Sequence, residues 1–281
     1  MKKCFLYILI SLLSLPAFLQ PYVDPIQIRY TYALTSQQNN RATPFTHLWA
    51  GSDLPVKMGK GYLLVSPYFE SWQFDSASLK NVLPEVKSLV LPAGIIMPFK
   101  NPKWSFVLNA IVRTSGEQLF EDKSYQLGGA GFLSYEKVKG KKIRFGAYVN
   151  GDFFGLFVMP LLGADWRMNE KNYFFGLLPG RFTWEHKFSK SVYGGITFRA
   201  LTNSYRIQNG NFLRLDDNQL SAYMDLYPSK NICITLEPGY GIMRKLRTGS
   251  EKRKYYLNDN WGDGPFIKLS AAYRIRFEEK K

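Results

Sequence analysis

Apolar and polar residues alternate over long stretches of this chain. From Pro265 to Phe277 every second residue is apolar, and the residues between them are mostly polar or basic, among them Lys268 and Arg274. Because successive side chains of a β-strand point to opposite faces, this period predicts a strand with one apolar face. The same alternation recurs, which predicts an all-β chain. The other stretches are 26–34, 104–113, 143–150, 156–167, 220–226 and 232–242.

The length of these stretches indicates strands that cross a membrane. Strands of soluble proteins usually have about five or six residues, whereas a strand that crosses a bilayer needs about 9–11. The connections alternate between short ones, such as Lys139–Lys141, and long ones, such as Gln73–Lys87, Gln208–Asp217 and Lys245–Gly264. Tight periplasmic turns and longer outer loops produce this alternation. Backbone groups in lipid must be paired within the protein. The sequence therefore predicts a closed, transmembrane, antiparallel up-and-down β-barrel.

The strand count depends on residues 172–188. Counting from either end places the turns at Met168 and Ser189 on the periplasmic side, so the segment between them crosses twice or not at all. A tight turn at Leu178–Arg181 would join two short strands and give 14 strands, whereas the failure of one candidate pair would give 12. The other candidates are 26–36, 45–57, 61–72, 88–99, 103–114, 125–138, 142–151, 155–167, 191–206, 218–228, 231–245 and 264–277.

The N-terminal residues have the layout of a secretory signal peptide. Lys2 and Lys3 precede an apolar run from Phe5 to Leu15, and Pro16 and Ala17 follow it. A membrane-spanning anchor is the alternative, but it needs roughly 20 apolar residues, and this run is too short. We expect residues 1–20 to be removed, with cleavage after Ala17 or close to Gln20, and residues 21–281 to form one barrel domain. Together with the strand pattern, this predicts the outer membrane of a Gram-negative bacterium.

Charge and cysteine content narrow the possible partners. The formal net charge is +15, which would suggest nucleic acid in a cytosolic protein. The export signal and the lack of a nucleic-acid-binding motif disfavour that partner, and anionic lipid headgroups and a charged barrel interior are the alternative. Cys4 precedes the apolar run and cannot be a lipoprotein cysteine, so Cys233 would stand alone in the mature chain and form no intramolecular disulfide.

The polar faces and the aromatic residues predict two sets of positions. On the polar face, basic and acidic side chains would line the lumen. Aromatic rings would form a girdle at the membrane surface on the short-turn side. The candidate lumen residues are Arg29, Arg113, Arg144, Arg199, Asp225, Glu237, Lys268 and Arg274. The candidate girdle residues are Trp104, Trp166, Trp184, Phe188 and Phe277.

Catalytic, metal-binding and cofactor-binding motifs are not evident. Barrel enzymes that act on lipids use a Ser–His pair, and the chain has two histidines, His47 and His186, without a matching serine motif. No His/Cys/carboxylate cluster has metal-ligand spacing, and no glycine-rich phosphate loop is present. We therefore expect no enzyme activity and no cofactor, with a lipid-modifying enzyme as a distant alternative.

The C-terminal strand resembles the signal that the outer-membrane assembly machinery recognises. Ser270, Ala272, Ile275 and Phe277 occupy its polar, small, apolar and aromatic positions, although Ala272 stands where glycine is usual and residues 278–281 follow the aromatic. The resemblance implies the assembly machinery as a partner.

A larger part of the chain, roughly residues 85–277, resembles an uncharacterised family of Gram-negative, Bacteroidota-type outer-membrane β-barrel proteins. That family is known only as a domain of unknown function. The stretches 163–167, 176–180 and 193–195 carry the resemblance. It implies a location and a fold, and no activity.

Three functions are compatible with such a barrel. A pore or uptake channel for small solutes is the first, and inward-facing Arg and Lys would favour anions. A non-conducting structural or binding barrel is the second, because the same charges could pair with one another and fill the lumen. A lipid-modifying enzyme is the third. On fold, the runner-up is a soluble lipocalin-like barrel, which would have shorter strands.

Overall fold

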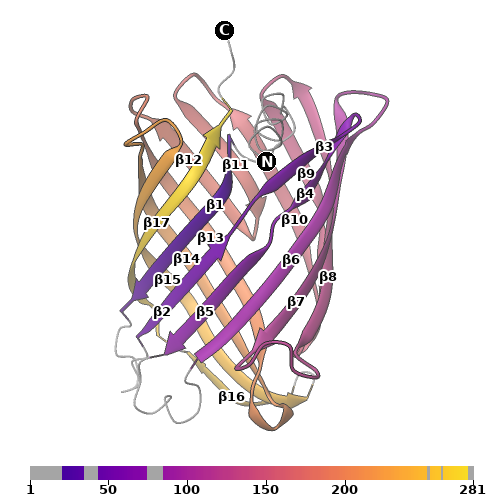
Figure 1. Cartoon of the computed structure of the whole chain (residues 1–281), viewed down its shortest axis with the longest axis vertical. Coiled ribbons are helices and arrows are strands. Elements are labelled where there is room, and N and C mark those ends of the chain that lie inside the picture. Colours follow the sequence, from indigo (N-terminus) through magenta and orange to yellow (C-terminus); the bar gives the residue numbers. More distant parts are fainter. Residues whose placement is uncertain (1–20, 35–43, 75–84, 252–253, 261, 278–281) are drawn as a thin grey trace, which may run out of the picture.

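The computed structural model describes residues 21–34, 44–74, 85–251, 254–260 and 262–277 (Figure 1). The predicted signal peptide, residues 1–20, lies outside these ranges, as does most of the predicted loop 73–87. No helix among the described residues has the length and hydrophobicity needed to cross a membrane.

The described strands form one antiparallel sheet that closes on itself. Most strands pair with the strands that precede and follow them in the chain, whereas β2 pairs with β5, β4 with β6, and β15 with both β16 and β17. β1 closes the ring by pairing with both β2 and β17. The first and last described residues and the short turns lie at one end of the barrel, uppermost in Figure 1. The strands are β1 (Tyr22–Ala33), β2 (Phe45–Gly51), β3 (Leu54–Met58), β4 (Gly61–Val65), β5 (Tyr68–Phe74), β6 (Glu85–Pro98), β7 (Trp104–Gly116), β8 (Tyr125–Val138), β9 (Lys141–Asp152), β10 (Gly155–Arg167), β11 (Asn172–Leu178), β12 (Arg181–Lys187), β13 (Val192–Arg206), β14 (Phe212–Leu226), β15 (Ile232–Glu251), β16 (Lys254–Asn260) and β17 (Gly264–Arg276).

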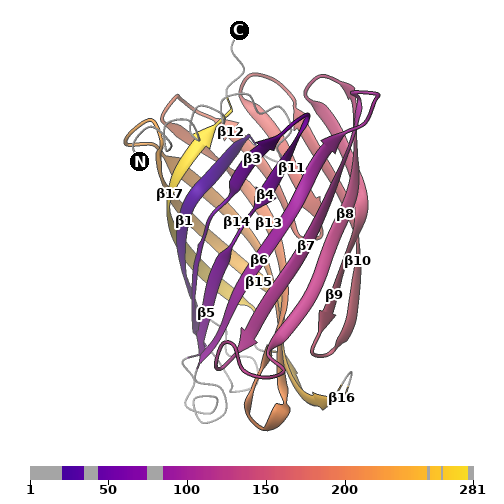
Figure 2. The same ribbon diagram turned by 45° about the vertical axis from the view of Figure 1, so that its right-hand side comes forward.

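The ring has 14 strands, the upper of the two predicted counts. The pairs β2/β3, β4/β5 and β16/β17 are each two segments of one crossing. The ambiguous segment 172–188 forms the short hairpin β11–β12, joined by a turn at Pro179 and Gly180. Each of its strands has only 7 residues, so the hairpin fills the wall at the short-turn end alone (Figure 2).

The outer face is apolar around the ring. Ile28, Leu108 and Leu236 are exposed on it, while the residues between them point inward. A closed sheet with an apolar outer band satisfies the backbone and suits lipid. The protein is therefore an outer-membrane β-barrel.

Two segments predicted as loops continue the strands instead. β14 already begins at Phe212 and β15 extends to Glu251, so the predicted loops 208–217 and 245–264 contain paired backbone. Charged residues break the apolar alternation there. These parts of the strands leave the lipid-facing wall. The alternation of apolar and polar residues therefore stops at the edge of the membrane-spanning part, although the strand itself continues.

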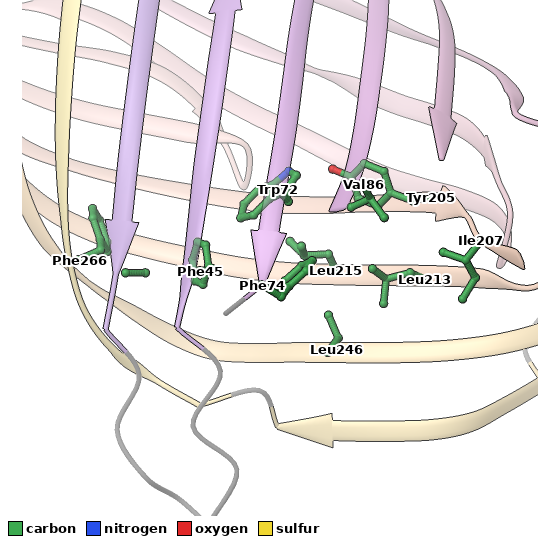
Figure 3. Packing of buried hydrophobic residues seen from close by; sticks show 11 residues of the cluster. Phe45, Trp72, Phe74, Val86, Tyr205, Ile207, Leu213, Leu215, Leu246 and Phe266 are labelled. Carbon is green, nitrogen blue, oxygen red and sulfur yellow. The ribbon is translucent and has the colours of Figure 1, made fainter. Parts of the chain in front are cut away.

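At the loop end, the far parts of β13, β14 and β15 pack against the inner face of β1, β2, β5 and β6. Figure 3 shows the two sets of strands crossing, with apolar side chains between them. Trp72, Phe45, Tyr205, Leu213 and Leu215 are fully buried in this contact. We call it the loop-end cluster, and it fills the lumen at this level. Its other members are Ala33, Phe74, Val86, Ile207, Leu246 and Phe266.

At the short-turn end, the first residues of β1 and the last residues of β17 lie across the lumen. Val23 and Ile275 are paired on the face of β1 and β17 that elsewhere contacts lipid. Val23 is nevertheless only 1% exposed. They pack against inward-facing Tyr62, Ile96 and Phe132 of the opposite wall. We call this the short-turn cluster, and its remaining buried members are Val107 and Leu161. The ends of β1 and β17 thus divide this half of the lumen.

The lipid-facing assignment predicts a depth-dependent cost for charge. Replacing Leu236 by Arg in the middle of β15 places a charge within the hydrocarbon and should lower the free energy of unfolding by about 2–4 kcal/mol. The matched control is Met168→Arg on the outer surface at the short-turn end, with an expected loss below about 1 kcal/mol. Guanidinium titration of the protein in phospholipid vesicles measures both values, and equal losses would contradict the assignment.

Candidate functional site

The structure places all eight predicted lumen residues inside the barrel. Six of them are almost fully buried by other side chains, and Arg29 and Arg199 are half-buried. The lumen is thus a packed polar interior, and its charges face one another across it. The six buried residues are Arg113, Arg144, Asp225, Glu237, Lys268 and Arg274.

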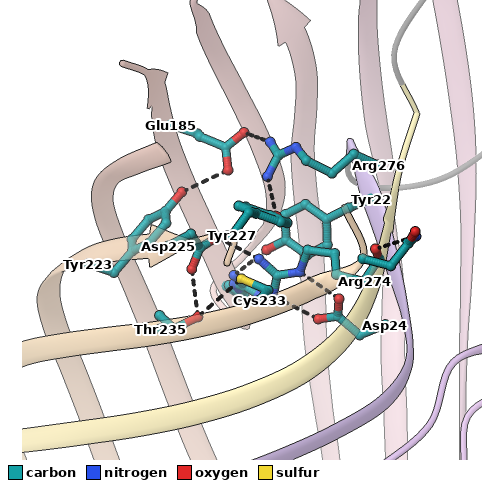
Figure 4. A network of polar contacts seen from close by, with 12 residues as sticks. Tyr22, Asp24, Glu185, Tyr223, Asp225, Tyr227, Cys233, Thr235, Arg274 and Arg276 are labelled. Carbon is teal, nitrogen blue, oxygen red and sulfur yellow. Dashed lines mark hydrogen bonds and ion pairs between the residues drawn. The ribbon is translucent and has the colours of Figure 1, made fainter. Parts of the chain in front are cut away.

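Arg274 is the centre of the largest polar network (Figure 4). Its guanidinium donates from Nε and one Nη to the carboxylate of Asp24, at 2.6 and 2.8 Å, and from the other Nη to Asp225, at 2.5 Å. The group also lies 3.8 Å from the ring centroid of Tyr22. Asp225 accepts a further bond from the hydroxyl of Thr235 at 2.6 Å. Arg274 therefore ties the end of β1 to the wall formed by β14 and β15.

Arg276 makes the second tie between the strand ends and the wall. It donates to Glu185 on β12 and to the hydroxyl of Tyr227, and its guanidinium lies 3.6 Å from the ring centroid of Tyr193. Glu185 also accepts from the hydroxyl of Tyr223 at 3.2 Å. A bidentate or stacked guanidinium fixes geometry as well as charge, so these contacts hold the end of β17 in one position.

Nearer the middle of the lumen, Lys268 connects β17 with β14 and β15. Its ammonium group donates to Glu237 at 2.7 Å and to Gln219 at 3.0 Å. Next to it, Arg244 donates from Nε to Asp217 at 2.8 Å, and both side chains are fully buried. Breaking a buried ion pair leaves an uncompensated charge, so these two pairs oppose separation of β14, β15 and β17 from one another. Arg244 also lies 5.1 Å from the ring centroid of Phe45 on β2, and this contact joins β15 to the wall.

The remaining predicted residues belong to networks on β5 to β10. Arg144 donates to Asp165 at 3.0 Å. Arg113 donates to Asn203, which itself donates to Glu70 at 2.9 Å. Glu70 joins the wall to the inward part of β13, because it also accepts from the hydroxyl of Tyr205.

His47 belongs to this last network. Its Nε2 lies 3.3 Å from Glu70, and its ring stacks on Trp72 at a centroid distance of 3.7 Å. No serine hydroxyl bonds to His47 among the described contacts. This histidine is a packed structural side chain, and the contacts give it no nucleophile.

A small cavity of about 30 Å³ lies between these networks, on the side of β1, β12 to β15 and β17. Such a volume holds about two water molecules. Every side chain that lines it is polar. The charged ones are Arg29, Arg181, Arg199, Arg274, Asp225 and Glu237, four cations and two anions.

Two of the cavity arginines have donors without a hydrogen-bond partner. The Nε groups of Arg29 and Arg199 are buried and unpaired. Arg29 is instead held by the ring of Trp49, at 4.5 Å from its centroid. Buried donors without a partner are costly in a polar network. The excess of positive charge and the free donors make this cavity the place in the lumen best suited to a small anion.

Four of the five predicted girdle residues lie on the outer face near the short turns. Trp166 and Phe188 are exposed, Trp104 packs beside Tyr135, and Trp184 lies near His186. Phe277 does not join them, because it packs against the short-turn cluster inside the barrel. The physical reason is the inward course of the end of β17. His186 is bonded to Asn172 at 2.8 Å.

Sequence reasoning missed several charged partners. Tyr22 and Asp24 precede the predicted start of the first strand at residue 26, and Pro25 with a β-bulge breaks the alternation after them. Asp217 and Arg244 fall at or near predicted loop boundaries. Their only sequence signal is that charge interrupts an alternating pattern. The described residues contain no group of three or more His, Cys, Asp or Glu side chains that could hold a metal ion.

Comparison with known proteins finds similar folds only. No family profile and no curated protein matches the chain. An outer-membrane channel of Pseudomonas putida F1 has a TM-score of 0.47 and 7% identity, covering 93% of this chain and 98% of its own. The NanC porin has a TM-score of 0.40 and 10% identity, covering 89% and 100%. The toluene transporter TodX of Pseudomonas putida has a TM-score of 0.40 and 9% identity, covering 95% and 93%. At these values the similarity carries no argument about solute or mechanism.

The Arg274 network predicts a large and reversible effect on stability. Arg274→Met leaves Asp24 and Asp225 buried without their cation, so the free energy of unfolding should fall by about 3–5 kcal/mol. Adding Asp24→Asn and Asp225→Asn should recover much of the loss. The control is Lys87→Met, which breaks the half-exposed pair of Lys87 and Glu85 and should cost below about 1 kcal/mol. Denaturant unfolding in vesicles measures all variants. A loss for Arg274→Met no larger than for Lys87→Met would contradict the network.

Proposed function

We propose that this barrel is a gated outer-membrane pore for small anionic solutes. The observation that carries the proposal is the cavity with four arginines and two carboxylates, in which Arg29 and Arg199 keep unpaired donors. Rings of Arg and Lys favour anions in pores. The cavity is enclosed on the loop side by the loop-end cluster, so conduction requires that cluster to separate from the wall.

The loop-end strands are suited to act as the gate. They are held to the wall by a limited number of contacts, namely the apolar cluster around Trp72, the bonds of Glu70, and the contact of Arg244 with the ring of Phe45. The rest of β13, β14 and β15 belongs to the continuous sheet. Movement of these ends would open the lumen without breaking the ring.

The second candidate is a barrel that does not conduct. Its support is the pairing of charged groups across the interior, in which Arg274, Arg276 and Lys268 join several strands. The proposed partners are outer-membrane lipids and, through the C-terminal strand, the assembly machinery. In that strand Ser270 and Ala272 are buried, and Ile275 and Phe277 pack inside the barrel. A lipid-modifying enzyme has the least support, because His47 pairs with Glu70.

The arginine cavity predicts anion selectivity in a planar bilayer. Under a salt gradient, the unaltered protein should give a reversal potential on the anion side, and Arg29→Gln with Arg199→Gln should shift it toward zero. Lys190→Gln with Lys230→Gln removes the same two positive charges at exposed turns and should leave the potential unchanged. No current at any voltage from protein that shows the heat-modifiable gel mobility of a folded barrel would contradict the pore and favour the non-conducting barrel.

The gate predicts that weakening the loop-end cluster raises conductance. Trp72→Ala removes its largest side chain and should cost about 3–5 kcal/mol of unfolding free energy, while the open probability of single channels rises. Trp104→Ala makes the same substitution on the outer face and should leave channel opening unchanged. Equal open probabilities for Trp72→Ala and unaltered protein would contradict this gate.

A further inference from the structure

The barrel wall is incomplete between β10 and β13. The hairpin β11–β12 pairs with Leu162–Arg167 of β10 and with Tyr193–Arg199 of β13. Toward the loop end, the described residues provide no strand partner for β10 over 155–161 on its side away from β9. They provide none for β13 over 201–205 on its side away from β14. Two facing strand edges therefore lack partners.

This break is a window with defined borders. Toward the short-turn end it is bordered by the hairpin tip, where Gly180 accepts a bond from the backbone of Ala200 at 2.9 Å. Toward the loop end it is bordered by the β9–β10 turn, where the backbone N–H of Phe153 donates to Ser204 at 3.2 Å. Arg206 also lies 4.2 Å from the ring centroid of Phe153. Two strands separate β10 from β13 at the hairpin, so the edges there are about 14 Å apart, three spacings of about 4.8 Å.

The window lies at the depth of the lipid. Leu156 and Val158 of β10 are strongly exposed on the outer face beside it, and the window is in the half of the barrel that carries the long loops. Unpaired backbone groups facing lipid cost several kcal/mol each, and such backbone is tolerated where it lines a cavity or contacts protein. Pro160 lies within the free edge and has no N–H to leave unpaired. A free strand edge at this depth is therefore unusual, which indicates that the edge has a function.

The residues of β10 at the window are apolar. Phe157 and Met159 are its inward-facing residues at the opening, and both are only partly buried. Phe157 contacts the rings of Tyr148 and Phe154, and Arg214 lies 4.2 Å from the ring centroid of Phe154.

The arginine cavity lies along β12 to β15 and β17. Its Arg181 and Arg199 stand next to the hairpin-tip border of the window at Gly180 and Ala200.

Apolar side chains continue from the window to the short-turn end. The next inward residue of β10, Leu161, belongs to the short-turn cluster, which extends through Phe132 and Val107 to Ile96 and Val23. At that end the ring separates again, since β3 pairs only with β4 among the described strands and β1 pairs with β2 only from Gln27 onward. The cluster thus connects two breaks in the wall.

We propose that the window between β10 and β13 admits small non-polar solutes from the outer leaflet into the barrel. Inside, they follow the short-turn cluster to the periplasmic end. This route follows β10, whereas the arginine cavity lies along β12 to β15 and β17. The short-turn cluster is closed by packing of flexible side chains, so passage requires side chains to move and leaves the backbone pairing unchanged.

Photolabelling with a small aryl diazirine dissolved in the bilayer tests the route. The full mature chain in phosphatidylcholine vesicles is irradiated, and the adducts are located by mass spectrometry. Adducts are expected on Met159 and Leu161 as well as on the outward-facing Val158. Phe45 and Phe266 of the loop-end cluster provide the internal control, because they are buried and apolar but lie on β2 and β17, away from the window, and they should remain unlabelled.

Two matched variants identify the window as the path. Met159→Trp crowds the opening and should reduce labelling of Leu161 severalfold, whereas Met224→Trp, on the outer face of the intact wall, should not. Arg29→Gln should leave labelling unchanged, so failure of the anion pore would not affect this result. Adducts confined to outward-facing residues in the unaltered protein would overturn the proposal, as would labelling of Leu161 no greater than that of Phe45.

Discussion

Backbone N–H and C=O groups inside a bilayer must find partners within the protein, and most features of this barrel follow from that constraint. It forces the sheet into a ring, closed where β1 pairs with β2 on one side and β17 on the other. It also fixes the alternation of apolar and polar residues, since each strand has one face in lipid. The informative places are those where the pairing stops, between β10 and β13 and between β1 and β3.

At each of these places the strand ends turn inward and are held by buried charges. The ends of β1 and β17 are tied to the wall through Arg274 and Arg276. The ends of β13 to β15 are held by Glu70 and by the contact of Arg244 with Phe45. Buried ion pairs contribute little net stability compared with apolar packing, but they penalise any arrangement that separates them. The charges therefore specify where the inward strands lie, and apolar contacts supply most of the packing energy.

The result is a lumen with two different sides. One side is polar, has an excess of arginine and contains a small cavity. The other is apolar and extends from the window at β10 to the short-turn end. The ends of β1 and β17, which separate the two sides, have one polar and one apolar face. Asp24 and Arg274 face the polar side, and Val23 and Ile275 face the apolar side. Alternation along a strand, which normally separates lumen from lipid, here separates two compartments.

The sequence predicted the fold closely and the interior only in part. Strand positions, the inward direction of residues such as Arg144 and Asp225, and the second crossing within 172–188 follow from alternation and connection length, which are local properties. The partner of Arg274 could not be predicted, because Asp24 is 250 residues away in the chain. Nor could the inward course of Phe277, whose position in the alternation matches those of lipid-facing residues, or that of Val23, because the β-bulge between Val23 and Ile26 breaks the alternation there. A clue existed in β14, where the outward positions change from Leu220 and Met224 to Arg214 and Asp216.

The position of Arg274 tests the inward course of the strand ends most directly. Solid-state NMR distance measurements between guanidinium ¹⁵N and carboxylate ¹³C nuclei, on the protein in lipid bilayers, report this contact, and Arg274→Met assigns the signal. The account predicts strong dephasing of the Arg274 guanidinium by the carboxylates of Asp24 and Asp225, at hydrogen-bonding separation. A guanidinium signal for Arg274 without carboxylate dephasing, as for a side chain in a water-filled lumen, would contradict it.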